Sequence, residues 1–114
     1  MRKRMQTWIS KGNPNVLHLN YLLEAEIAAV QQKTEKAKNR YREAISSSIR
    51  CGYKLDFAYA NERCSIFYQD ILGDTDFACR YMEDTIKAYE KIGAMANVEY
   101  LYRTYPDLSS PIED

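Results

Sequence analysis

Apolar residues recur at the spacing of a helix along most of the chain, and no stretch shows the sustained alternation of a β-strand. The first pattern starts after Asn15, a good N-cap residue, and it predicts a helix that ends near Gln32. Its main apolar stripe consists of Val16, Leu19, Leu23, Ile27 and Val30. A second stripe beside it consists of Leu22, Ala25 and Ala29. An apolar face this wide predicts neighbours on two sides of the helix.

Two further helices follow, and each ends at a glycine, the residue that most readily takes the left-handed turn closing a helix. The second is expected to be capped by Thr34 and to stop at Gly52, with a buried face of Ala37, Tyr41, Ala44, Ile45, Ser48 and Ile49. The third covers about residues 55–72 and stops at Gly73. Its main stripe is Phe57, Ala60, Cys64, Phe67 and Ile71, flanked by Leu55, Tyr59 and Ile66.

A fourth helix is capped by Asp74 or Thr75 and stops at Gly93, with Ala78, Met82, Thr85, Ile86, Tyr89 and Ile92 predicted to be buried. A fifth presents Met95, Val98, Leu101, Tyr102 and Tyr105 and ends before Pro106. The short connections between these helices predict antiparallel neighbours.

The second and fourth predicted helices match each other 41 residues apart. The matching positions are 37 and 78, 41 and 82, 44 and 85, 45 and 86, and the glycines 52 and 93. The order of small and large side chains is similar to the second helix of a tetratricopeptide (TPR) repeat, where small residues let helices approach closely. The predicted fold is therefore all-α: about five helices in antiparallel hairpins, stacked as a short TPR-like α-solenoid. The expected divisions are a basic N-terminal arm or short helix at 1–14, the repeat domain at 15–106 and a polar tail at 107–114.

Composition narrows the classes of function. The formal net charge is zero, so nothing attracts the whole chain to nucleic acid or membrane. The apolar runs are too short to cross a bilayer. The three cysteines, Cys51, Cys64 and Cys79, are widely spaced and form no CxxC motif. We expect them to be reduced core residues of a cytoplasmic protein.

No catalytic constellation is visible, so we expect a protein that is not an enzyme and holds no cofactor or metal. His18 is the only histidine, and a metal site needs several ligands. Glu24, Glu26 and Glu62 lack a nucleophile or phosphate-binding loop nearby, which favours solvated or helix–helix hydrogen-bonding carboxylates. Acidic residues interrupt the basic cluster at Lys33, Lys36, Lys38, Arg40 and Arg42, which favours a solvated helix face. A second basic cluster at Arg2, Lys3 and Arg4 suits an acidic partner.

Three groups of residues carry a family resemblance. The first is Trp8, Asn15, His18, Leu23, Glu24, Ala25 and Glu26; the second is YREAI at 41–45 with Gly52, Tyr53, Ala60, Asn61 and Glu62; the third is Gly93, Ala94, Val98, Leu101, Tyr105, Pro106 and Leu108. Together they resemble the helical repeat region of large multidomain signalling proteins. Those proteins carry a serine/threonine-kinase-like domain, an AAA-type ATPase, this region, a GAF domain and a histidine kinase. The present chain covers only the last part of the helical region.

The resemblance implies a non-enzymatic connector or interaction segment between the ATPase and the GAF and histidine-kinase modules. The alternatives are a fragment of an ATP-dependent sensor kinase whose catalytic domains are absent from this chain, and a basic helical domain that binds nucleic acid. The expected partners are proteins or neighbouring domains of a larger chain, with no membrane, and a homodimer through exposed repeat ends carrying Phe57, Phe77 and the 95–105 face. Tyr21, Tyr68 and Tyr100 lie off the best stripes and are the candidate interaction surface, since exposed tyrosine is enriched at interfaces.

Overall fold

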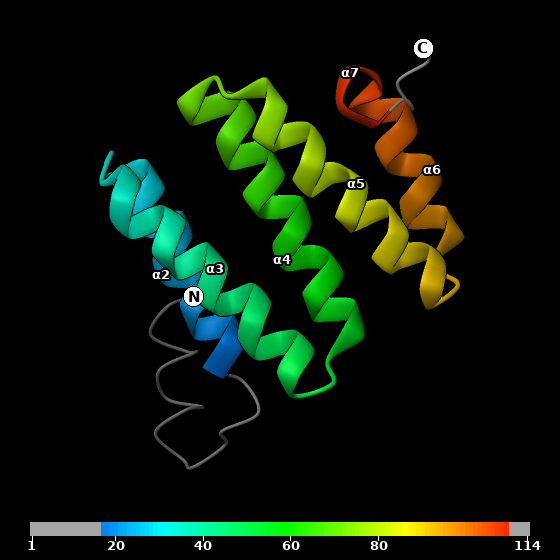
Figure 1. The fold of residues 1–114 in the computed structure, drawn as a ribbon, viewed down its shortest axis with the longest axis horizontal. Coiled ribbons are helices and arrows are strands. Elements are labelled where there is room, and N and C mark those ends of the chain that lie inside the picture. The colour runs from blue at the N-terminus through cyan, green and yellow to red at the C-terminus, as the bar shows by residue number, and fades with distance from the viewer. Residues whose placement is uncertain (1–16, 110–114) are drawn as a thin grey trace.

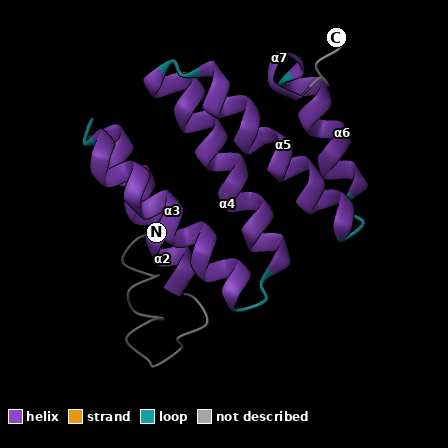
Figure 2. Cartoon of the chain, viewed as in Figure 1, coloured by secondary structure: helices purple, strands orange, loops and turns teal. Residues whose placement is uncertain are grey.

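The computed structural model describes residues 17–109, and this part of the chain is helical with no β-strand. The helices are α2 (Leu17–Val30), α3 (Thr34–Arg50), α4 (Lys54–Phe67), α5 (Thr75–Lys91), α6 (Met95–Thr104) and the short α7 (Pro106–Ser109), and a π-helical turn, η2 (Tyr68–Leu72), extends α4. Helix α2 packs on α3, α4 on α5, and α3 on α4. The row ends with α6 and α7 against α5 (Figures 1 and 2). No described helix has both the length and the apolar character that a bilayer crossing requires.

Left-handed residues end the helices at the predicted places. Gly52, Gly73 and Gly93 have φ of +83°, +67° and +75°, which confirms them as helix stops. The turn after α2 uses Gln32 instead, at φ +64°, although side chains with a Cβ disfavour this conformation. Asp74 caps α5, because its side chain accepts a hydrogen bond from the backbone N–H of Phe77. Thr34 does not cap α3: it is the first residue of that helix, and the cap position belongs to Lys33, which makes no side-chain cap bond.

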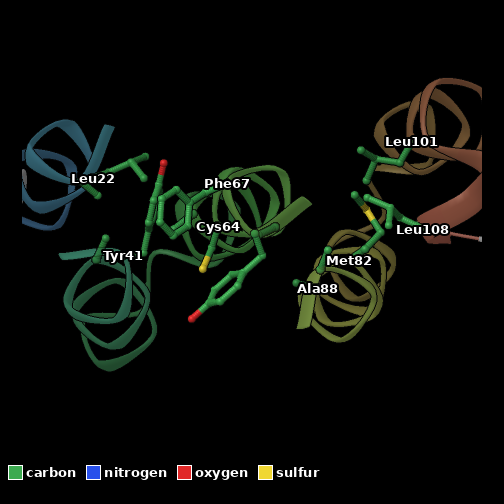
Figure 3. Packing of buried hydrophobic residues seen from close by; sticks show 14 of the residues in the cluster. Leu22, Tyr41, Cys64, Phe67, Met82, Ala88, Leu101 and Leu108 are labelled. Atoms are coloured by element: carbon green, nitrogen blue, oxygen red, sulfur yellow. The ribbon is translucent and has the colours of Figure 1, made fainter. Parts of the chain in front are cut away.

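The core consists mainly of small side chains with a few large ones between them. Alanines 25, 28, 37, 44, 58, 60 and 78 are almost wholly buried, so the helices approach closely. Tyr41 and Phe67 fill the space between α3 and α4, with ring centroids 5.1 Å apart. Met82 lies next to Leu101 and Leu108 where α5 meets α6 and α7 (Figure 3). Leu108 and Ser109 are buried, so the packed part of the molecule extends to residue 109.

Most residues of the predicted stripes in α3 to α6 are buried, but some predicted positions are exposed. In α2 the alanine stripe with Leu22 is buried, whereas Val30 is 82% exposed. In the third predicted helix the flanking residues Leu55 and Tyr59 are exposed, and so is Ile71 at its end. The same holds for Ile49 in α3 and for Met95 and Tyr102 in α6. Close helix contact selects small residues, so the most hydrophobic stripe is not always the buried one.

Buried polar side chains bond to nearby backbone carbonyls. Ser48, which was predicted on the packing side, is fully buried and donates to the carbonyls of Ala44 and Ile45 at 2.9 and 3.0 Å. Ser65 of α4 donates to the carbonyl of Ala78 in α5 at 2.6 Å. Asn61 and Thr85 bond within their own helices to Phe57 and Tyr81. These bonds satisfy hydroxyl and amide groups that would otherwise cost free energy in the core.

The three free cysteines differ in exposure. The prediction of core residues is right for Cys64, which is 1% exposed, and wrong for Cys51, which is exposed at the end of α3. Cys79 is half-buried. Burial raises the pKa of the Cys64 thiol to about 12, so this thiol stays protonated and unreactive in the folded protein.

Candidate interaction surface

Glu26 of α2 joins three helices. Its carboxylate accepts a hydrogen bond from the Tyr41 hydroxyl of α3 at 3.0 Å and from Nε of Arg63 in α4 at 2.8 Å. Burial, followed by the nearby Glu26 charge, raises the pKa of Tyr41 well above its usual value, so the hydroxyl remains a donor. The Arg63–Glu26 ion pair is about one-third exposed on both sides. These contacts position α4 against the first two helices and leave part of the charged pair at the surface.

Glu62 of α4 occupies a corresponding place in the next pair of helices. It accepts a hydrogen bond from the Tyr89 hydroxyl of α5 at 2.9 Å. No cation forms an ion pair with Glu62 within residues 17–109, and burial raises the pKa of its carboxyl above the usual 4.5. Both glutamates thus bind a tyrosine of the partner helix, as the sequence predicted for helix–helix carboxylates, and only one of them has a cation.

His18 is a buried link between α2 and α4. It is 4% exposed, its Nε2 lies 2.8 Å from Oδ2 of Asp56, and its ring stacks on Tyr53 with centroids 4.8 Å apart. The structural role expected for this histidine agrees with these contacts. Within the described residues, no three His, Cys, Asp or Glu side chains gather in a way that would hold a metal ion.

A hollow lies along the outer face of α5, where α6 and α7 cover only part of the helix. It measures about 960 Å³ and is lined by apolar and charged side chains: Asp76, Phe77, Cys79, Arg80, Glu83, Ile86, Lys87, Glu90, Tyr102, Asp107, Leu108 and Ser109. We call it the α5–α7 groove. Phe77 is 44% and Tyr102 is 41% exposed, so two aromatic rings are accessible there. Aromatic rings above an apolar floor are typical of protein-binding surfaces.

The candidate tyrosines do not form one surface. Tyr68 is 6% exposed and its ring stacks on Phe77 and Tyr81 at 5.4 Å, so the expectation that it is exposed is wrong. The physical reason is the π-helical turn at Tyr68, which changes the direction of its side chain relative to a continuous α-helix. Tyr100 is 49% exposed on α6, and Tyr21 lies half-buried beside Arg42 and Arg50.

The remaining residues of the family resemblance are scattered. Trp8 and Asn15 lie outside the described residues. Glu24 pairs with Arg40 at 2.9 Å, and Asn61 is a core residue. Tyr105 is the C-cap of α6 and Pro106 is the first residue of α7, where proline fits because that N–H needs no partner. These positions are structural in the described part of the chain.

The basic cluster of α3 is partly neutralised. Arg40 pairs with Glu24 and Glu43, and Lys38 pairs with Glu35. Arg42 bonds to Asn39. A nucleic-acid surface needs basic groups free to bind phosphates and release their counterions, and the pairing of these side chains opposes that role.

Sequence reasoning found the groove only in part. It identified Phe77 and the 95–105 face as apolar surface, but not the acidic residues Asp76, Glu90 and Asp107 around them. The sequence signal for the acidic rim would have been acidic residues recurring on the outer face of an amphipathic helix. Such a pattern is too common to identify a binding surface.

No known protein family, curated protein or solved structure matches this chain. The geometry of the described residues therefore carries the argument for function.

Proposed function

We propose that this chain is a non-enzymatic interaction or connector segment built from TPR-like helix pairs. The observation that carries the proposal is the α5–α7 groove, an apolar hollow of about 960 Å³ with two half-exposed aromatic rings and a charged rim. Stacked helix pairs bury one face on the preceding pair and offer the next face to a partner. A groove with accessible aromatic rings, an apolar floor and a polar rim has the character of a protein-binding site.

The helix pairs support the TPR-like description. In α3 and α5 the buried positions 37, 41, 44 and 48 correspond to the buried positions 78, 82, 85 and 89. In α2 and α4 the buried positions 22, 25, 28 and 29 correspond to 58, 61, 64 and 65. The same order of buried positions in successive pairs favours a repeated unit.

The partners proposed here are the modules that flank the similar region in multidomain signalling kinases. Binding of the full chain to the purified ATPase-side and GAF-side modules of such a kinase tests this, by calorimetry. Tyr102→Glu in the groove is expected to weaken binding at least about tenfold, because it puts a charge in a desolvated aromatic contact. Tyr100→Glu is the matched control, since it changes the same residue type on the same helix at similar exposure outside the groove.

Failure of both modules to bind contradicts the connector role. If Tyr100→Glu abolishes binding while Tyr102→Glu does not, the partner binds through another face of α6 and the groove is not the site. The sensor-kinase alternative is tested separately by reading the coding sequence on both sides of this chain for kinase and GAF modules.

A further inference from the structure

We propose that the α5–α7 groove binds the basic N-terminal segment, residues 1–14, of a second copy of this chain. The proposal names a partner for the surface described above and rests on its role as an interaction site. Its first support is the unbalanced charge around the groove.

The acidic residues of the groove outnumber the cations available to them. Lys87 pairs with Glu83 at 3.3 Å, and the Arg80 guanidinium lies 5.6 Å from the centroid of the Phe77 ring. Both cations therefore have local partners. In the described part of the chain, Asp76, Glu90 and Asp107 have no ion-pair partner. The rim thus offers three unpaired carboxylates around an apolar floor that includes Ile86 and Leu108.

The groove is only partly covered by the helices that follow α5. Within the described chain these are the ten residues of α6 and the four of α7. Phe77 and Tyr102 at the groove remain 44% and 41% exposed. A further segment therefore has apolar surface left to cover.

Residues 1–14 have the complementary chemistry. They carry Arg2, Lys3, Arg4 and Lys11 and no acidic residue, and they contain Trp8 and Ile9. Basic side chains match the rim, and tryptophan is the side chain that most often anchors a protein interface in an apolar pocket. The other end of the chain is excluded by charge, because Glu113 and Asp114 have the same sign as the rim.

Reach favours a second copy over the same copy. Helix α2 begins at Leu17, near one end of the row of helices, whereas α5, α6 and α7 lie at the other end (Figure 1). The molecule is 50 Å along its longest axis. The segment before α2, fully extended, reaches at most about 55 Å, which would leave few residues to bind after crossing the molecule.

Trp8 supplies the measurement, because it is the only tryptophan. The full chain is followed by sedimentation and by tryptophan emission over a wide range of concentration. We expect association that shifts the Trp8 emission to the blue and weakens as salt is added, because exposed charge pairs are screened.

Charge reversal identifies the contact. Arg2→Glu with Lys3→Glu and Arg4→Glu, or Glu90→Lys with Asp107→Lys, is expected to weaken association at least about tenfold. Combining both sets in one chain restores it. Glu35→Lys with Glu99→Lys is the matched control with the same change in net charge outside the groove, and it leaves association intact.

Three results overturn the proposal. The first is a chain that stays monomeric at every concentration. The second is association that neither reversal weakens, or that the combined variant fails to restore. The third is a Trp8 emission that depends on Glu90 and Asp107 but not on concentration, which assigns the segment to the groove of its own copy. Binding of kinase modules is measured independently, so failure here leaves the connector role standing.

Discussion

The two helix pairs α2–α3 and α4–α5 bury residues at corresponding positions, but only α4 is extended by a π-helical turn. Buried positions of α2 recur 36 residues later in α4, while those of α3 recur 41 residues later in α5. The five residues of difference equal the length of the π-helical turn, Tyr68–Leu72. The buried positions of the first pair thus recur in the second with five additional residues between its two helices.

The turns show the same difference. After α2 the N–H of Lys33 donates to the carbonyl of Ala28, five residues back, at 2.9 Å. After η2 the N–H of Asp74 donates to Tyr68, six residues back, at 2.8 Å. Both bonds close a helix through a left-handed residue, Gln32 or Gly73. The end of η2 therefore has the same kind of turn as the end of α2. The added π-helical turn explains why α2 and α4 correspond at a spacing of 36 residues, whereas α3 and α5 correspond at 41.

The largest effect is expected in the cores of the two pairs. Met82→Ala removes a fully buried side chain and should reduce the free energy of unfolding by about 2–5 kcal/mol. Tyr41→Ala, at the equivalent position of the first pair, should cost about 3–5 kcal/mol, because it also leaves Glu26 without its hydroxyl donor. Urea denaturation followed by circular dichroism measures both. Val30→Ala, 82% exposed, is the control and should change stability by less than about 0.5 kcal/mol.

The turns come next in size. Gln32→Gly should stabilise the protein by about 1 kcal/mol, because it relieves a left-handed residue that has a Cβ. Gly73→Gln, the reverse change in the second pair, should cost a similar amount. Lys33→Asp should add about 1 kcal/mol by supplying the cap that Asp74 gives α5. Thermal unfolding of the three variants measures these differences. Equal effects of both turn substitutions in the same direction would refute the equivalence of the two turns.

The two glutamates should respond differently to loss of charge. Glu26→Gln breaks the ion pair with Arg63 and should cost about 0.5–1 kcal/mol, since the pair is partly exposed. Glu62→Gln keeps an acceptor for the Tyr89 hydroxyl and removes a charge that forms no ion pair within residues 17–109, so its cost should be near zero. Chemical denaturation at neutral pH compares the two. A larger loss in Glu62→Gln than in Glu26→Gln would contradict this account of the second pair.

The smallest effect is the pH dependence of Glu62. Its folded pKa lies above the unfolded value, so the folded state binds more protons between the two values. The stability contributed by this carboxyl therefore rises as pH falls through its folded pKa toward 4.5, and is lost as pH rises again. Glu62→Gln should flatten that slope. Asp84, whose pKa is also raised by burial, should leave a residual slope that Asp84→Asn removes.

Sequence patterns predicted the helices and their stops well, because glycine and proline act locally. Gly52, Gly73, Gly93 and Pro106 end helices through their own backbone preferences. The side of each helix that is buried was harder to predict. Helix α2 has two apolar stripes, and close packing against the neighbouring helices buries the alanines rather than the larger side chains. The pattern within one helix carries no information about how close its neighbours lie.

The candidate surface was harder still. The burial of Tyr68 depends on a π-helical turn, for which we see no signal in the sequence. The α5–α7 groove depends on how far α6 and α7 reach along α5, which is a property of three elements together. Phe77 was predicted as apolar surface because the end of a row of stacked repeats is expected to be uncovered, and it is 44% exposed.

The buried thiol of Cys64 allows the rate at which the helices separate to be measured. Its thiol lies between α3 and α5 beside Tyr81, and its raised pKa keeps it from reacting while the helices are closed. The exposed Cys51 reacts with a thiol reagent directly. In a Cys79→Ala background, the fast phase of labelling then calibrates the reagent. The slow phase then gives the rate at which the helices separate far enough to expose the Cys64 thiol to the reagent.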